Sequence, residues 1–413
     1  MTKINTLVID FLKWLAICVI VGLLVGTVSA FFLTLLDGVT TWRETHLWII
    51  YCLPIAGLLI GFIYFKYAGA ANKGNNLLLE EHRLAQNKIP LKMAPLVFIG
   101  TLLTHLCGGS AGREGTAVQM GGAIADQFTG LFKLNERERK TILIIGISAG
   151  FAAVFGTPIA GAIFAFEIML FKNIKYQNIL PSFATAFIAH YTCLAWNIHH
   201  TTYSIGIIPG ISFSSITWAA IAGIIFGCTA LLFSYVHIFF SSLFNHIKAI
   251  QFRPLVGGII LVLIITFIGN TKYIGLGIPS IIGAFEQPAG HYDFIIKLLL
   301  TTFTLSAGFK GGEVTPLFFI GATLGNILIW FIPLPMALLA GMGFVGVFAG
   351  ATHCSIASIA LGIEIFGFEA GLFIGIASVM SYFTSGTKGI YSAQLKEGAK
   401  YNLYNYVKRI SNL

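Results

Sequence analysis

Long apolar stretches recur along nearly the whole chain, broken by glycine and proline and separated by short polar segments. Several have the roughly 20 residues that a helix needs to cross a bilayer. Shorter or broken stretches are tolerated at membrane depth only where they are buried in protein or line a cavity. The pattern predicts an all-α, polytopic membrane protein with tilted, discontinuous helices. The stretches cover residues 7–36, 48–65, 93–106, 142–170, 180–196, 216–233, 255–268, 295–305 and 336–348.

Composition supports a lipid environment. Of the 413 residues, 56% are hydrophobic and 10% are charged, so the chain has too few polar side chains to cover a soluble globule. The first apolar stretch continues past Val28-Ser29-Ala30, the sequence most similar to a signal-peptide cleavage site. We therefore expect a retained first helix.

The net charge of +9 does not indicate a nucleic-acid partner, because the basic residues lie at the ends of apolar stretches. This placement is typical of the positive-inside rule. It predicts a multi-pass protein of the cell inner (plasma) membrane with both termini in the cytoplasm. The basic residues concerned are Lys3, Lys13, Arg137, Arg139, Lys140, Lys172, Lys175, Lys388, Lys396, Lys400, Lys408 and Arg409.

Metal and disulfide chemistry have little support. The six cysteines are scattered, with no C-x-x-C pair and no histidine at ligand spacing, so we expect small packing residues and no cofactor. The adjacent His199 and His200 point in different directions and have no acidic neighbour. They are interpreted as part of a solvated loop.

An internal repeat is visible in two glycine-rich segments. Residues 112–116 (Gly-Arg-Glu-Gly-Thr) are echoed by residues 311–315 (Gly-Gly-Glu-Val-Thr), and Gly122-Ala123 by Gly321-Ala322, all at a spacing of 199 residues. A further echo relates residues 151–156 to 344–349. Broken apolar segments at corresponding places are typical of transporters with inverted repeats. We expect two halves in one membrane domain, residues 1–205 and 206–413.

An acid follows the glycine-rich turn in both segments. Glu114 and Glu313 are each expected in the first turn of a helix that starts inside the membrane, where N–H groups and partial positive charge attract anions. An ionisable group in a membrane span costs about 2.5 kcal/mol or more, so function is the default interpretation. Such a carboxylate can occupy the anion site and leave it when protonated, as gate and proton carrier together.

The segment 112–116 resembles the glycine-arginine-glutamate-glycine motif of the CLC anion transporters, with Thr116 where proline is usual. Residues 308–318 resemble the second-half anion motif in its fluoride-branch form, and Tyr391 stands where the family has an inner-gate tyrosine. The resemblance spans most of the chain. It implies a homodimer in which each subunit holds its own pathway.

Two departures from the chloride members resemble the fluoride branch. Gly74-Asn75-Asn76 replaces the serine loop, and Ile168, after Glu167, replaces the inner proton-relay acid. Fluoride is small and strongly hydrated, and hydrogen-bond donors replace its water shell. The expected anion-binding residues are Asn75, Asn76, Gly112, Arg113, Gly115, Thr116, Thr315, Phe318 and Tyr391.

The sequence therefore predicts a secondary active transporter that exports fluoride from the cytoplasm in exchange for protons, with Glu114 as gate and proton carrier and Glu313 as a second proton-coupled acid. A chloride/proton antiporter and a passive CLC-type channel remain alternatives. A remote alternative is an intramembrane serine hydrolase, because residues 108–112 fit G-x-S-x-G around Ser110, close to His105. A real nucleophile elbow follows a strand, however.

Overall fold

The structure is a computed structural model that describes residues 2–169 and 176–411. Within these residues the regular elements are helices, so the all-α prediction is confirmed; Lys172 and Lys175 lie outside the described residues. The α-helices are α1 (Thr2–Thr45), α2 (Leu53–Tyr67), α3 (Asn75–Leu84), α4 (Met93–Leu106), α5 (Glu114–Ala125), α6 (Phe128–Leu131), α7 (Glu136–Phe155), α8 (Pro158–Ile168), α9 (Tyr176–Ala195), α10 (Phe213–Asn245), α11 (Arg253–Ile268), α12 (Ile278–Glu286), α13 (Asp293–Ser306), α14 (Val314–Ile327), α15 (Met336–Thr352), α16 (Ser355–Phe366), α17 (Gly371–Thr384) and α18 (Ala399–Ser411).

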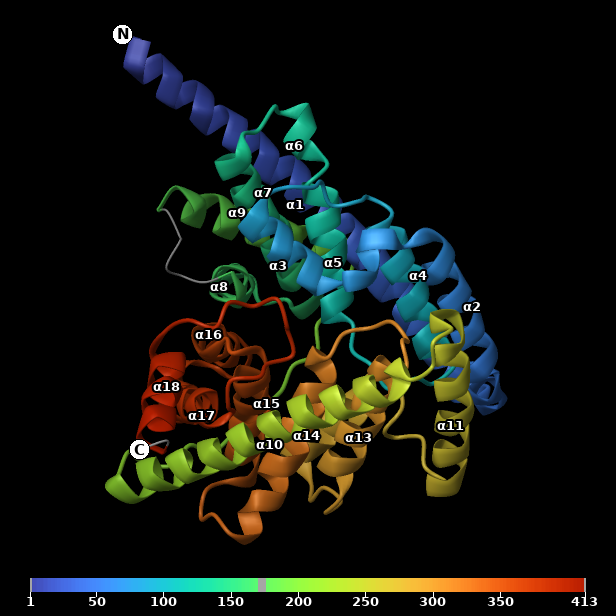
Figure 1. The fold of residues 1–413 in the computed structure, drawn as a ribbon. Helices are drawn as coiled ribbons and strands as arrows, with labels where there is room; N and C mark the ends of the chain where they lie inside the picture. The colour runs from blue at the N-terminus through green and yellow to red at the C-terminus, as the bar shows by residue number, and fades with distance from the viewer. Residues whose placement is uncertain (1, 170–175, 412–413) are drawn as a thin grey trace.

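Four of the described helical segments are long and apolar enough to cross a membrane: Val8–Thr45, Leu47–Tyr67, Phe213–Asn245 and Ile250–Ile268. The first belongs to α1, which runs through residues 28–30 without a break and projects from the rest of the molecule at its N-terminal end (Figure 1). Most other apolar helices have 10–17 residues. They are too short to cross alone, and this agrees with the prediction of discontinuous helices.

The helices of the first and second parts of the chain gather on opposite sides of the molecule. In Figure 1 most of the blue to green helices lie above, and most of the yellow to red helices lie below. α5 and α14 contact each other between the two groups. Their N-termini therefore meet inside the protein, where broken backbone is shielded from lipid.

Two glutamates connect corresponding helices from either side. Glu167, near the end of α8, accepts backbone N–H bonds of 3.0 and 2.7 Å from the first turn of α16. Glu364, near the end of α16, accepts bonds of the same two lengths from the first turn of α8. Each carboxylate caps the helix that carries the other one. This reciprocal pair is what a two-fold relation between repeats produces.

The capping pair also corrects a predicted repeat register. The residue that follows α7 is Gly156 and the one that follows α15 is His353, and both have left-handed backbone (φ 76° and 58°). Phe151 therefore corresponds to Phe348, not to Phe344 as the sequence similarity suggested. The similar small and aromatic residues of the two segments aligned Phe151 with a residue four positions before its structural counterpart.

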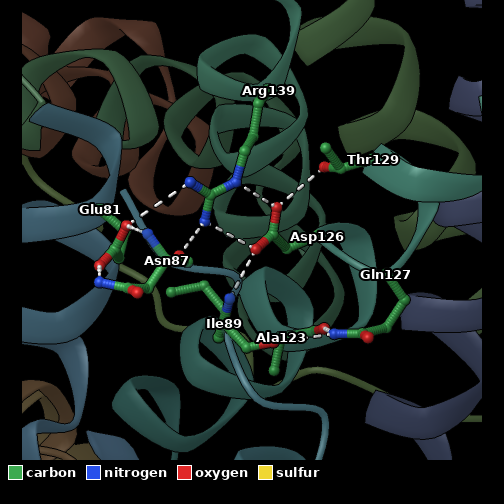
Figure 2. Close-up of polar contacts among 8 residues, drawn as sticks. All are labelled: Glu81, Asn87, Ile89, Ala123, Asp126, Gln127, Thr129 and Arg139. Carbon is green, nitrogen blue, oxygen red and sulfur yellow. Dashed lines mark hydrogen bonds and ion pairs between the residues drawn. The ribbon is translucent and has the colours of Figure 1, made fainter. Parts of the chain in front are cut away.

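A buried ionic network joins α3, α7 and the residues that follow α5 (Figure 2). Arg139 of α7 binds Asp126, just after α5, with N–O distances of 2.8 and 2.9 Å, and Glu81 of α3 at 3.5 Å. Asp126 also accepts the N–H of Ile89 at 2.7 Å. Arg139 is therefore not a surface charge, as the positive-inside interpretation implied. Lys400, likewise expected at the membrane surface, is buried too.

Candidate functional site

Two helices begin face to face at the centre of the molecule. α5 starts at Glu114 and α14 at Val314, each after a glycine-rich turn. Just before these starts, Gly112 and Gly312 exchange both backbone hydrogen bonds as an antiparallel pair, with N–O distances of 2.6 and 2.8 Å. The first N–H groups of a helix have no partner within it. The pair therefore concentrates hydrogen-bond donors and partial positive charge at one point, which suits an anion.

The Glu114 carboxylate accepts hydrogen bonds from donors at the start of α14. One oxygen accepts the backbone N–H of Thr315 at 3.0 Å and that of Arg113 at 3.2 Å. The other accepts the Thr315 hydroxyl and lies 3.7 Å from Nε of Arg113. The residue is 1% exposed. A carboxylate thus stands where an anion would bind, and the two would compete for the same donors.

Glu313 does not occupy the position equivalent to Glu114. It is the N-cap residue of α14, the place that Arg113 holds at α5, and Val314 is the counterpart of Glu114. The two turns correspond at a spacing of 200 residues, from Gly112 to Gly312, so the predicted spacing of 199 was wrong. Oε2 of Glu313 is buried and has no hydrogen-bond partner among the described residues.

Asn75, the first residue of α3, lies against Gly115. Its Nδ2 atom is 3.1 Å from the position that a Cβ at Gly115 would take, and Oε2 of Glu313 is 3.7 Å from the same point. A Cβ at residue 115 would crowd the Asn75 amide and Cα of Gly312, whereas Oε2 of Glu313 would remain at an ordinary contact distance. Oδ1 of Asn75 is buried without a partner in the described part of the chain. The amide therefore has unused hydrogen-bonding capacity beside the start of α5.

A cavity of about 180 Å³ adjoins these groups. Four of the predicted site residues line it: Asn75, Asn76, Glu313 and Tyr391. Asn76 also has a structural contact, because its Oδ1 accepts the N–H of Ala393 at 2.9 Å. This bond joins the start of α3 to the loop that carries Tyr391.

Residues 56–386 match the sequence model of the family described as voltage gated chloride channel. The chain belongs to this family, the CLC proteins. It is 45% identical over 389 residues to a "Chloride/fluoride channel protein" of Pseudomonas syringae pv. tomato, covering 92% of this chain and 86% of that protein.

Two solved structures share the CLC fold over almost the whole chain. A CLC-type fluoride/proton antiporter superposes with a TM-score of 0.90 at 34% identity, covering 94% of this chain and 98% of that one. A slow cyanobacterial Cl−/H+ antiporter superposes with a TM-score of 0.81 at 20% identity, covering 97% and 99%. The predicted resemblance to CLC transporters is confirmed.

Four of the predicted anion-binding side chains in this CLC protein do not line the cavity. Arg113 and Thr315 contact Glu114 instead, and Thr116 and Phe318 pack within the protein. The Thr116 hydroxyl is 2.7 Å from that of Thr101 and is fully buried. Phe318 stacks on Phe344 at 3.9 Å between ring centroids and also packs against Phe348. Thr116 therefore contacts α4 from the first turn of α5, and Phe318 contacts α15 from α14.

The serine hydrolase alternative is wrong for this CLC protein. The Ser110 hydroxyl is buried and lies 2.9 Å from the hydroxyl of Thr301. The His105 ring instead lies near the carbonyl oxygen of Gly112, at 3.4 Å. A buried serine that is hydrogen-bonded to threonine has no base to activate it.

Sequence reasoning missed several residues that line the cavity. Lys310 lies within the segment that resembled the second anion motif, but the motif gave this residue no role. Gln119 lies five residues after Glu114 in α5. With 3.6 residues in each turn, the two side chains point to different faces of the helix, so the motif around Glu114 did not indicate Gln119. Phe309 lies in the same motif segment as Lys310, whereas Tyr64 comes from α2 and His237 from α10, which no motif marked. Those missed include Tyr64, Gln119, His237, Phe309 and Lys310.

Proposed function

We propose that this CLC protein exports fluoride from the cytoplasm in exchange for protons. The observation that carries the proposal is the position of the Glu114 carboxylate on the N–H and hydroxyl of Thr315. A carboxylate held by anion-binding donors is displaced by an anion that binds them better. It also leaves when a proton removes its charge. Fluoride binding and proton binding are therefore linked at one side chain.

Fluoride is the proposed substrate because the site offers hard, localised donors. Hydroxyl and amide groups from Thr315 and Asn75 can replace the water shell of a small anion. One relative in this family is named for chloride and fluoride, and a solved structure at 34% identity is that of a fluoride/proton antiporter. These likenesses favour fluoride over chloride alone.

Exchange is favoured over passive conduction because a titratable group blocks the path. Glu114 is buried among the anion donors, so an anion passes only when this side chain moves. Ile168 is buried where chloride exchangers are expected to have the inner acid. Glu313, with a buried oxygen beside the cavity, is the proposed second proton carrier.

The same reasoning gives a cellular arrangement. We infer an inner (plasma) membrane protein with both termini in the cytoplasm, assembled as a homodimer with one pathway in each subunit. Each subunit is proposed to consist of two inverted-repeat halves, residues 1–205 and 206–413, in a single membrane domain.

Substrate choice is tested with the purified protein in liposomes loaded with either anion. We expect fluoride efflux, followed with an ion-selective electrode, to be much faster than chloride efflux under the same conditions. An imposed proton gradient should drive fluoride against its own gradient. Chloride efflux as fast as fluoride efflux would remove the substrate assignment, and fluoride flux that ignores the proton gradient would leave only a channel.

Glu114→Gln tests the coupling residue. The amide keeps the shape of the side chain but removes the titratable charge, so proton-driven fluoride accumulation should be lost while the protein elutes as wild type does. Glu313→Gln should also slow proton-coupled transport if Glu313 carries protons. If Glu114→Gln accumulates fluoride as wild type does, Glu114 does not couple the two ions.

A further inference from the structure

The cavity beside Glu313 contains a lysine that neither the motifs nor the proposed transport cycle uses. Lys310 lines it together with Tyr64 and Asn72. Its ammonium donates a hydrogen bond to Oδ1 of Asn72 at 3.2 Å and lies 4.0 Å from the centroid of the Tyr64 ring. Both neighbours are uncharged. No carboxylate of the described residues forms an ion pair with Lys310.

The other lysine on this cavity is different. Lys73 forms an ion pair of 2.6 Å with Glu80, and its side chain is 56% exposed. Its charge is therefore matched by a neighbouring carboxylate and screened by solvent. Lys310 contributes a positive charge to the wall of the cavity, and no ion pair among the described residues neutralises it.

Three elements hold Lys310 in place. Asn72 belongs to the short 3-10 helix at Gly69–Lys73, and Tyr64 belongs to α2. The backbone N–H of Lys310 donates to Oγ1 of Thr104 in α4 at 3.3 Å. An ammonium that is positioned by neutral groups keeps its capacity to attract an anion, because the contacts fix its direction without cancelling its charge.

We propose that Lys310 is the anion-capture residue at the mouth of the pathway, drawing fluoride into the cavity from which it reaches Asn75 and the donors held by Glu114. This assignment rests on the proposed function and extends it by one step. A single cation at the opening of a low-dielectric cavity raises the local anion concentration, and ionic strength weakens this effect. Lys310 therefore sets the concentration at which transport saturates, whereas Glu114 sets the coupling.

The test is the dependence of fluoride efflux on fluoride concentration at low and high ionic strength, in liposomes containing wild type, Lys310→Met, Lys310→Arg or Lys73→Met. Lys310→Met keeps most of the apolar stem and loses the charge. We expect it to raise the KM for fluoride by about threefold to tenfold with kcat nearly unchanged. Added salt of a large, impermeant anion should raise the wild-type KM towards that of Lys310→Met and leave the variant unaffected. Lys310→Arg should stay close to wild type.

Lys73→Met is the matched control, since it removes the same charge from a residue of the same cavity that already has an acidic partner. It should leave KM near the wild-type value. An unchanged KM in Lys310→Met, or an equal rise in Lys73→Met, would overturn the proposal. If Lys310→Met does not fold, a wild-type KM that is independent of ionic strength overturns it as well. Wild-type protein that moves chloride but not fluoride would refute the fluoride assignment instead, and the same KM comparison would then be made with chloride.

Discussion

Glu114 takes its polar contacts from both sides of the boundary between α5 and α14. Arg113 lies on its own side, and Thr315 lies on the other. Every one of these neighbours is a donor, so the contacts stabilise the ionised carboxylate and do little for the protonated acid. In the proposed cycle, a proton on Glu114 weakens several contacts at once and so frees the side chain to move. This is the physical basis for expecting protonation and anion entry to be coupled.

Lys400 is a second buried charge, at the start of α18 and outside the membrane-spanning helices. Its Nζ donates to Oγ of Ser385 at 2.8 Å, and burial lowers the pKa of its ammonium from 10.5 to about 7. Between about pH 7 and pH 10 the unfolded chain therefore binds this proton more tightly than the folded chain does. The free energy of unfolding should rise with pH across this window.

Thermal unfolding in detergent between about pH 7 and pH 9 measures this contribution. The rise of Tm with pH should be smaller in Lys400→Met than in wild type. Lys388→Met is the control, because Lys388 is exposed and should leave the pH response unchanged. Equal pH responses in Lys400→Met and wild type would show that the buried ammonium is not responsible.

At the scale of residues, the sequence predicted which side chains are near the site better than which way they point. Glu114 and Thr315 were expected at helix starts and do meet there. Thr116 and Phe318 were expected to bind the anion but pack within the protein. A residue's direction depends on the helix register relative to its neighbours, and a motif fixes composition and order but not that register.

Among the elements, α3 and α5 share an anchor far from the anion site. Their N-terminal ends carry Asn75 and Glu114, while the opposite end of each helix is tied to Arg139 (Figure 2). A short helix is nearly rigid, so fixing one end limits the movement of the other. The network therefore helps to maintain the separation between the amide and the gate.

Arg139→Gln should destabilise the protein by about 3 to 5 kcal/mol, as expected when one partner of a buried ion pair is removed and the acids are left unpaired. Denaturant unfolding in detergent would measure the loss. Lys13→Gln is a control that also removes an ion pair made to α7, because Lys13 of α1 and Glu138 of α7 form a partly exposed pair of 2.6 Å. It should cost less than about 1 kcal/mol. Similar losses in the two variants would mean that burial of the Arg139 network adds nothing.

The helices themselves were largely predictable because apolar runs and glycine-rich starts are local signals. Their correspondence was predicted less well. Matching letters gave a spacing of 199 residues, whereas backbone pairing gives 200, from Gly112 to Gly312. With the spacing of 200, the residue equivalent to Glu114 is Val314 and not Glu313. A comparison of the two sequences aligns the repeated glutamate. The structural correspondence, however, depends on the residue at which each turn ends and its helix begins.

For the whole molecule, composition and the run of apolar segments were sufficient to predict a helical membrane protein. The packing of α8 against α16, in which Glu167 and Glu364 accept hydrogen bonds from the helix N-termini, was not predictable from the sequence. Capping contacts between residues 190 and 204 positions apart have no local signal. Nor did the sequence predict which polar residues would form the cavity wall, since these come from helices distant along the chain.

Assembly gives a prediction at this scale. A homodimer with independent pathways should have about twice the protein mass of one chain, 44.7 kDa, when detergent-corrected light scattering is used. Mixed dimers of wild type and Glu114→Gln should transport at about half the wild-type rate, because each subunit works alone. A monomer in mild detergent, or mixed dimers that lose all activity, would contradict this arrangement.

The antiparallel pair of Gly112 and Gly312 limits how the pathway can open. Its two hydrogen bonds are made by backbone groups buried at the centre, and separating them without water would cost the desolvation of four polar groups. A rocking movement that pulls the two helix starts apart would break both bonds. In the proposed transport cycle, we therefore expect access from either side to change through rotation of side chains such as Glu114, while the Gly112–Gly312 pair stays closed.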